Sequence, residues 1–378
     1  MNGLTYLDHA ATTPMRADAI EAMLPYLAEQ YANPSGAHRF ARQAREAIDD
    51  ARELVAGVVG CLPGEVVFTS GGTESDNTAV LGAVARRSGR ALCTAAEHHA
   101  VLAAVERVHG TVVPVDAAGA VDLEALAAEL RRDPDVAVVS VMAVNNEVGT
   151  ITDLAAVSAV VRSLAPAALL HTDAVQAPCW LDLRTITPLV DLLSLSAHKF
   201  GGPKGAGMLM IRSGVSIDPL VIGGGQERER RSGTQNVPSI VALAVALLGA
   251  DAERNDESVR LSALRNHLVD ALVAALPGVT ETVPRHRKVA GSAHVCIDGI
   301  ENEALLFLLD EAGVCASAAS ACASGAMEPS HVLAAMGVHR SLAQGAVRLT
   351  LGRTTTEADV DRALQVLVGA VGRLRRKQ

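Results

Sequence analysis

A lysine and an aspartate each stand at the end of an apolar run with the length of a β-strand. Lys199 follows residues 191–196, and Asp173 follows residues 168–172. Ligands of open α/β sheets collect at the carboxyl ends of the strands. A partly buried lysine there would be a nucleophilic amine, and the carboxylate could hold a protonated ring nitrogen. Taken alone, each residue also fits a simpler role, a surface lysine and a helix-capping or buried hydrogen-bonded aspartate.

Two further segments could contribute to the same site. Residues 70–75, Ser-Gly-Gly-Thr-Glu-Ser, stand where an expected strand meets an expected helix, and such a turn can bind a phosphate through backbone N–H groups. An ordinary turn with Thr73 as the helix N-cap is the alternative. His98 follows the apolar run 91–94, where it could be a capping residue or face a ligand.

Cys322 differs from the other five cysteines because it lies in residues 316–326, which contain only Ala, Ser, Gly and Cys. Such a tract is either a mobile loop that carries a thiol or a tightly packed turn. The other cysteines fit the pattern of small buried hydrophobic residues. No Cys-x-x-Cys pair and no Cys/His cluster has metal-ligand spacing, so we expect no metal.

Together these groups describe one ligand. A phosphate, an aldehyde that needs a lysine, a ring nitrogen that needs a carboxylate and a ring face that needs an aromatic partner are the features of pyridoxal 5'-phosphate (PLP). The sequence therefore predicts a PLP site.

The elements that must position these residues alternate along the first two thirds of the chain. Short apolar runs and helical stretches between residues 40 and 215 predict an α/β fold with a mostly parallel sheet. A long helix is expected over 237–276, followed by a smaller α+β unit. We predict a large domain over 15–255 and a small domain formed by 1–14 and 256–378, with the segment before residue 15 outside both sheets.

Composition excludes several classes of protein. Hydrophobic residues make up 49% of the 378, which supports a sizeable core. The net charge of −9 gives no support for binding nucleic acid or anionic membranes. The longest apolar run, 240–250, is too short to span a bilayer, and no signal peptide is visible. These features predict a soluble, cytoplasmic protein.

The sequence resembles the class V aminotransferase-like PLP enzymes, and among them the cysteine desulfurases with a longer catalytic-cysteine loop. The resemblance covers nearly the whole chain. The motifs that carry it are Tyr6-Leu7-Asp8-His9-Ala10-Ala11-Thr12-Thr13-Pro14, Thr69-Ser70-Gly71-Gly72-Thr73-Glu74-Ser75-Asp76-Asn77, Val144-Asn145-Asn146-Glu147-Val148-Gly149, His171-Thr172-Asp173-Ala174-Val175-Gln176, Ser196-Ala197-His198-Lys199, Gly223-Gly224-Gly225-Gln226-Glu227, Arg231-Ser232-Gly233-Thr234, Cys322 with Glu328-Pro329-Ser330, and Val347-Arg348. The implied fold is PLP fold type I.

The resemblance also implies a role for each site residue. Lys199 is expected to bind PLP covalently, Asp173 to pair with the ring nitrogen, and His98 to stack on the ring and move protons. The other expected cofactor contacts are Gln176 at the ring 3'-oxygen, Asn146 near the cofactor, and Gly72, Thr73, Ser196 and His198 at the phosphate. Thr234 is expected to reach the phosphate of the neighbouring subunit, which implies a homodimer.

The implied reaction removes sulfur from L-cysteine. Arg348 and Asn33 are expected to hold the substrate carboxylate, while Cys322 accepts the sulfur as a persulfide and leaves alanine. The sulfur then passes to an acceptor protein whose identity stays open. Two alternatives remain at this point: a selenocysteine lyase or other PLP β-eliminase, and a PLP fold that serves only as a partner-binding subunit.

The sequence departs from the family pattern in two places that matter. The approach to the cysteine reads Ser317-Ala318-Ala319-Ser320-Ala321-Cys322, where the family has Ser-Ser-Gly-Ser-Ala-Cys. Housekeeping members carry a longer C-terminal tail that docks the iron–sulfur scaffold, whereas this sequence stops at Gln378. Iron–sulfur cluster assembly, tRNA or DNA thiolation and thio-metabolite synthesis therefore all stay open, although direct nucleic-acid binding is not expected.

Overall fold

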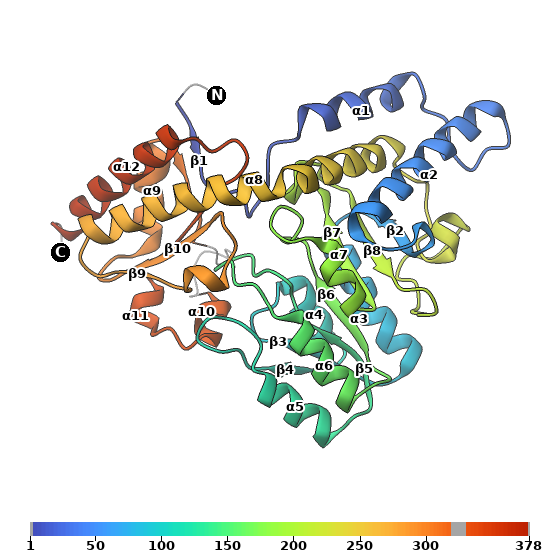
Figure 1. Cartoon of the computed structure of the whole chain (residues 1–378), viewed down its shortest axis with the longest axis horizontal. Coiled ribbons are helices and arrows are strands. Elements are labelled where there is room, and N and C mark those ends of the chain that lie inside the picture. The colour runs from blue at the N-terminus through green and yellow to red at the C-terminus, as the bar shows by residue number, and fades with distance from the viewer. Residues whose placement is uncertain (1–2, 319–329, 377–378) are drawn as a thin grey trace.

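A seven-stranded sheet forms the larger part of the computed structural model, which describes residues 3–318 and 330–376 (Figure 1). Its strands run in the order β2 (Val66–Thr69), β8 (Gly207–Ile211), β7 (Leu192–Ser196), β6 (Leu169–Asp173), β5 (Val136–Ser140), β3 (Arg90–Thr94) and β4 (Thr111–Val113). Only β8 runs against its neighbours, so the predicted mostly parallel α/β sheet is confirmed. Parallel order brings the carboxyl ends of β5, β6 and β7 to one edge.

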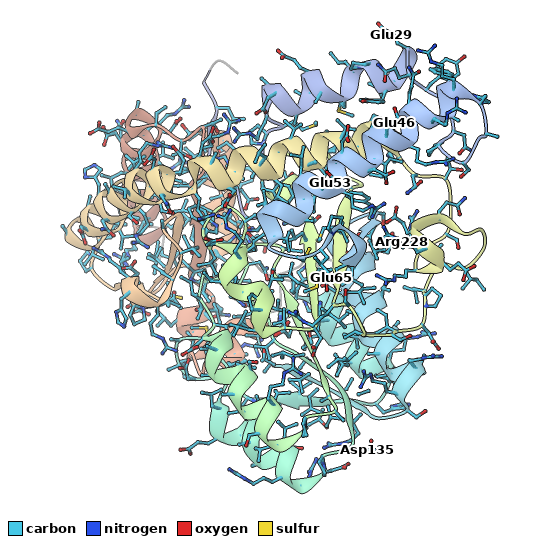
Figure 2. The ribbon with its side chains drawn as sticks, turned by 45° about the vertical axis from the view of Figure 1, so that its right-hand side comes forward. Glu29, Glu46, Glu53, Glu65, Asp135 and Arg228 are labelled. Atoms are coloured by element: carbon cyan, nitrogen blue, oxygen red, sulfur yellow. The ribbon has the colours of Figure 1, made fainter. Side chains whose placement is uncertain are left out.

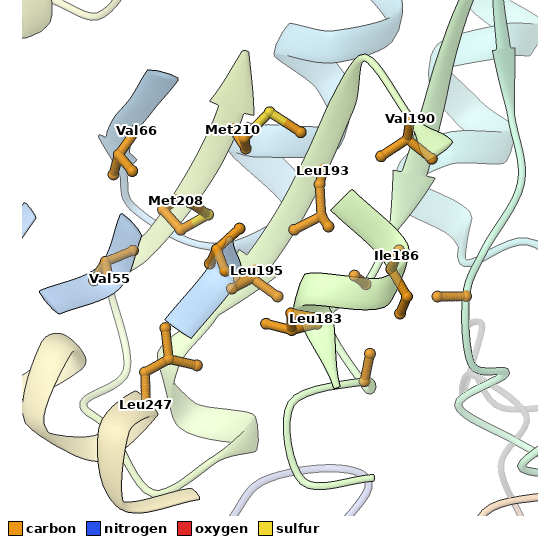
Figure 3. Close-up of a cluster of buried hydrophobic side chains, with 14 of the residues drawn as sticks. Val55, Val66, Leu183, Ile186, Val190, Leu193, Leu195, Met208, Met210 and Leu247 are labelled. Carbon is orange, nitrogen blue, oxygen red and sulfur yellow. The ribbon is translucent and has the colours of Figure 1, made fainter. Parts of the chain in front are cut away.

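Helices cover both faces of this sheet because its strands are apolar on both sides. The helices that precede or connect its strands are α1 (Ala17–Ala28), α2 (Arg39–Val59), α3 (Gly72–Arg87), α4 (His99–Arg107), α5 (Leu123–Arg132), α6 (Leu154–Leu164) and α7 (Leu183–Ile186). Leu193 and Leu195 of β7 join the cluster under α2, α7 and α8, together with Met208 and Met210 of β8 (Figure 3). Leu192 points the other way, into the cluster under α3 and α4.

Helix α2 shows how the sequence pattern sets the packing of one covering element. Its apolar side buries Ile48 and Val55, while Glu46 and Glu53 lie on the opposite, exposed side (Figure 2). The helix ends at Gly60, whose φ of 79° is left-handed, and a Cβ there would come within 2.9 Å of Arg184. Glycine fits that position because it tolerates the dihedral angle and the close approach.

A second, smaller unit contains an antiparallel sheet in the order β12 (Ala346–Thr350), β10 (Ser292–Ile297) and β9 (Val279–Glu281). Its helices are α9 (Asn302–Glu311), α10 (His331–Ala335), α11 (Arg340–Ala343) and α12 (Glu357–Arg375). Short 3-10 turns occur at η1 (Pro63–Glu65), η2 (Thr187–Leu189), η3 (Ala197–Lys199), η4 (Gln226–Glu229) and η5 (Arg285–Arg287). This arrangement matches the α+β unit expected after residue 276.

The N-terminal segment lies beside the smaller unit. Strand β1 (Thr5–Tyr6) pairs in parallel with β11 (Val314–Cys315) in a separate two-stranded sheet, and Asp8 bridges to Thr350. The segment is thus outside both larger sheets, as expected. Leu7 is fully buried in the core of the smaller unit.

Helix α8 (Val237–Ala275) joins the two units and runs across the upper half of Figure 1, below α1. Its first half packs into the core of the large sheet, and its second half, from Leu261 onward, packs into the core of the smaller unit. We keep a domain boundary near residue 255, within this helix, as a proposal. In the described ranges no helix is long and apolar enough to cross a membrane.

Candidate active site

A cleft of about 620 Å³ opens at the carboxyl ends of β5, β6 and β7. Its walls come from the N-terminal segment, the start of α3, the segments after β3 and β5, the turn after β6, η3 and strand β12. Ten residues predicted from the sequence line it together: Gly72, Thr73, His98, Asn146, Asp173, Gln176, Ser196, His198, Lys199 and Arg348. The structure therefore gathers these residues, which are spread over nearly 280 positions, around one space.

Three predicted residues are not part of this lining. Asn33 and Thr234 are exposed, and neither lines the cleft within one chain. Their sequence neighbours Pro34 and Gln235 line one shared surface pocket of about 450 Å³. Cys322 lies outside the described residues. Asn33 and Thr234 thus share one surface away from the chain's own cleft.

The amine of Lys199 is held by the N-terminal segment. Lys199 ends the short turn η3 that follows β7, and its Nζ donates to the carbonyl oxygens of Ala10 and Ala11 at 2.6 and 2.8 Å. The pKa of Lys199 is lowered to about 8, mainly by burial and secondly by the nearby guanidinium of Arg348. A larger share of the amine is therefore neutral and nucleophilic near pH 7 than for an exposed lysine.

Asp173 supplies a buried carboxyl at the end of the neighbouring strand β6. Its Oδ1 accepts a hydrogen bond from the Val175 N–H at 2.9 Å. Burial raises the pKa of Asp173 to about 6, while the Val175 hydrogen bond and the charge of Lys199 act in the opposite direction. A protonated ring nitrogen next to this carboxyl would favour its ionised form. The group therefore suits a cationic heterocycle.

The start of α3 forms a cradle for an anion. Helix α3 begins at Gly72, so its first backbone N–H groups have no partner inside the helix. A Cβ at Gly72 would lie 2.7 Å from Cγ2 of Val175, so that no larger residue fits here without displacing its neighbour. Thr73, Ser196 and His198 line the same part of the cleft. These donors fit a phosphate group.

His98 is a neutral ring at the edge of the cleft. It is the N-cap of α4, and its Nδ1 accepts a hydrogen bond from the Ala100 N–H at 3.1 Å. Desolvation by the surrounding protein, followed by the charge of Lys199, lowers the pKa of His98 to about 4. With Nδ1 occupied as an acceptor, the neutral ring carries its proton on Nε2.

Two buried acids near the cleft were not predicted as site residues. Glu97 is fully buried, and its Oε1 accepts hydrogen bonds from Thr94 Oγ1 and the Met142 N–H, both at 2.8 Å. Burial raises the pKa of Glu97 to about 8. Asp76 lines the cleft, and its pKa is raised well above the usual range. Burial is the main cause, and the negative charge of Asp173 is the second. Asp76 stood inside one of the sequence motifs and Glu97 stood next to His98, but nothing local indicated their burial.

Arg348 presents a guanidinium that is already oriented. It lies in β12, where Nη2 donates to Oδ1 of Asp8 at 2.7 Å and Nη1 donates to the carbonyl oxygen of Asn146 at 2.9 Å. Nε has no hydrogen-bond partner among the described residues. The side chain is buried at the floor of the cleft, where a fixed guanidinium suits the carboxylate of a substrate. Asp8 is a further residue that the sequence did not single out.

An amine after one strand of a mostly parallel sheet and a carboxyl at the end of its neighbour define a class of protein. This fold and site are those of the PLP-dependent enzymes of fold type I. The chain belongs to the aminotransferase class-V family, whose model matches residues 5–363.

Relatives and solved structures agree with this assignment. The chain is 46% identical to the "IscS-like cysteine desulfurase" of Mycobacterium tuberculosis over 99% of this chain and 98% of that protein. It is 42% identical to "Cysteine desulfurase IscS" of Methanosarcina thermophila, over 99% of this chain and 93% of that protein. A solved structure of a "NifS-like protein" superposes with a TM-score of 0.90 at 37% identity, over 98% of this chain and 99% of that one. The structure "SspA in complex with cysteine" superposes with a TM-score of 0.80 at 30% identity, over 92% of this chain and 98% of that one.

Proposed function

We propose that the protein is a PLP-dependent cysteine desulfurase that takes sulfur from L-cysteine and leaves L-alanine. The observation that carries the proposal is the cleft that Lys199, Asp173, the start of α3 and Arg348 line together. The full-length identity to proteins named cysteine desulfurase supports the same activity.

The residues of the cleft fit PLP. Lys199 would bind it covalently, Asp173 would pair with its ring nitrogen, Gln176 would reach its 3'-oxygen, and the ring of His98 would stack on it. Gly72, Thr73, Ser196 and His198 would hold the phosphate, and Asn146 would lie near the ring. When bound, PLP supplies an electron sink for the carbon atoms of an amino-acid substrate.

The chain's own groups position the substrate and move its protons. Arg348 would hold the carboxylate of L-cysteine, since its Nη atoms are already oriented by Asp8 and by the Asn146 carbonyl. The neutral amine of Lys199 can accept a proton, and the Nε2–H of the neutral His98 ring can donate a hydrogen bond to a reacting group. The Lys199 pKa of about 8 lies close enough to neutral pH for the amine to exchange protons there, whereas the His98 pKa of about 4 keeps that ring neutral.

Cys322 is the best candidate for the sulfur acceptor within the chain. Burial raises the pKa of every cysteine that the structure describes, namely Cys61, Cys93, Cys179, Cys296 and Cys315. Such thiols form little thiolate, which is the nucleophilic species. In the proposed step the Cys322 thiolate forms a bond to the substrate sulfur as the carbon–sulfur bond breaks, and the carbon takes up a proton. The products are a persulfide and alanine.

The proposal includes a homodimer with shared sites. Thr234 would reach the phosphate of the second subunit, and the position of Asn33 near the same surface supports its contribution to that subunit as well. The sulfur acceptor would be a protein of iron–sulfur cluster assembly, tRNA or DNA thiolation, or thio-metabolite synthesis, in the cytoplasm.

Product analysis tests this function. The purified, PLP-loaded protein with L-cysteine and a thiol reductant should release equal amounts of alanine and sulfide. Without reductant, mass analysis should find a persulfide on Cys322. The Cys322→Ala variant should keep the visible absorbance of bound PLP and produce neither sulfide nor persulfide. Desulfuration at the parent rate by this variant would contradict the proposal and indicate another PLP lyase, for which L-selenocysteine should be tested next.

A further inference from the structure

The start of helix α10 is attached to the wall of the cleft by side-chain contacts that the proposed reaction does not use. Ser330 and His331 begin this segment, eight and nine positions after Cys322 in the sequence. Ser330 is buried, and its hydroxyl caps α10 by accepting from the Leu333 N–H at 3.2 Å.

Glu147 makes the first attachment. The Ser330 hydroxyl donates to Oε2 of Glu147, whose side chain is buried. Glu147 sits in a turn fixed by Asn145, whose Oδ1 accepts the backbone N–H groups of Glu147 and Val148. The carbonyl oxygen of Asn146, in the same turn, accepts from Arg348. The contact therefore joins the start of α10 to the turn that orients the carboxylate-binding arginine.

His331 makes the second attachment, close to the first, since its Nδ1 lies 4.0 Å from Oε1 of Glu147. Its Nε2–H donates to the carbonyl oxygen of Glu97 at 2.9 Å, and its ring lies 4.5 Å from the ring of His99, centroid to centroid. Glu97 and His99 are the sequence neighbours of His98. The start of α10 is thus fixed directly against the segment that presents the neutral His98 ring to the cleft.

We propose that Glu147 and His331 are positioning residues for sulfur transfer. Together they fix one end of the chain segment that contains Cys322 relative to the two groups that handle the substrate, Arg348 and His98. This inference rests on the proposed function, because it assigns the two residues to the transfer of sulfur to Cys322 and not to the binding of L-cysteine. A residue needed only for folding would affect both steps.

Two variants separate the steps. His331→Phe keeps a ring beside His99 but removes the donor to Glu97, and Glu147→Gln keeps an acceptor for Ser330 but removes the charge. L-cysteine binding can be monitored through the absorbance of bound PLP. The dissociation constant should stay within about twofold of the parent value. The rate of Cys322 persulfide formation in a single turnover should fall by about tenfold in His331→Phe, on the scale of one lost hydrogen bond. The rate of Cys322 persulfide formation should fall less in Glu147→Gln than in Glu147→Ala.

A matched control comes from the next helix. His339 caps α11 through Nδ1, is exposed and touches neither the Glu147 turn nor Glu97. His339→Ala should leave both steps unchanged. If the His331 and Glu147 variants slow binding and transfer equally, or leave transfer at the parent rate, the inference is wrong. If the parent protein itself forms no persulfide, the proposed function fails and this inference falls with it.

Discussion

Arg348 and Asp8 are 340 positions apart in the sequence, yet Nη2 of Arg348 donates to Oδ1 of Asp8 at 2.7 Å. The contact joins strand β12 to the N-terminal segment at the floor of the cleft. It fixes the guanidinium before any substrate arrives, which reduces the ordering needed on binding.

Replacement of Arg348 should therefore affect substrate binding most. In Arg348→Gln we expect KM for L-cysteine to rise at least about tenfold with a smaller change in kcat, because a charge-assisted contact to the carboxylate is lost. Steady-state kinetics with alanine detection measures both constants. Arg353→Gln is the matched control, since Arg353 follows the same strand but is exposed and forms no ion pair among the described residues. An equal rise in KM in both variants would argue against a specific carboxylate contact.

The lowered pKa of Lys199 predicts how PLP enters the apoprotein. Only the neutral amine attacks the aldehyde, so the incorporation rate should rise with pH and reach half its maximum near the Lys199 pKa of about 8. Stopped-flow absorbance on cofactor-free protein gives this profile. A midpoint near that of an exposed lysine, 10.5, would contradict the burial effect. Lys199→Ala should show no covalent incorporation and no turnover.

Glu97 should make stability depend on pH. Its pKa in the folded protein is about 8, against 4.5 for the unperturbed group, so the folded state holds this proton more tightly. Its contribution to the free energy of unfolding is full below pH 4.5 and declines as pH rises toward about 8. Glu97→Gln is neutral at every pH, so the fall in Tm between pH 5 and pH 8 should be smaller than in the parent. An identical fall would show that Glu97 is ionised in the folded protein.

Mixed dimers test the proposed role of Thr234. In one dimer, one chain carries Lys199→Ala and the other carries Thr234→Ala. The intact Lys199 site would then receive its partner's intact Thr234 and retain PLP normally. In the second dimer, both substitutions are in one chain, so the intact Lys199 site lacks the threonine and should lose PLP faster during dialysis. Equal retention in the two dimers would contradict a shared site.

The sequence predicted the elements with strong periodicity well and the short or unusual ones poorly. The helix predicted over 237–276 matches α8 (Val237–Ala275), and the apolar run 191–196 matches β7 (Leu192–Ser196) to within one residue. Helix α1 was not predicted, because it contains Pro25 and lacks a side-chain cap at Arg16. Strands such as β1 and β9, with two and three residues, are too short to show alternation and exist because of their pairing partners.

The site was predictable only where chemistry and local position coincide. Lys199 and Asp173 stand at strand ends, and a ligand site is expected there whatever the order of the strands. Asp8 gave no such signal, because its role depends on a partner at the other end of the chain. The burial of Asp76 and Glu97 likewise depends on how the strands are ordered in space, which local periodicity does not specify.

The N-terminal segment sets an order for the folding of this protein during its synthesis. Its strand β1 needs β11 as a partner, Asp8 needs Arg348, and the carbonyl oxygens of Ala10 and Ala11 hold the Lys199 amine. These early residues are therefore synthesised long before the partners in β11 and β12 on which they depend. The strands of the seven-stranded sheet all precede β12 in the chain. The floor of the cleft, however, is completed only when β12, which contains Arg348, has been synthesised. A nascent chain that ends before β12 contains Lys199 but lacks Arg348, so the cleft cannot be completed until that strand has been synthesised.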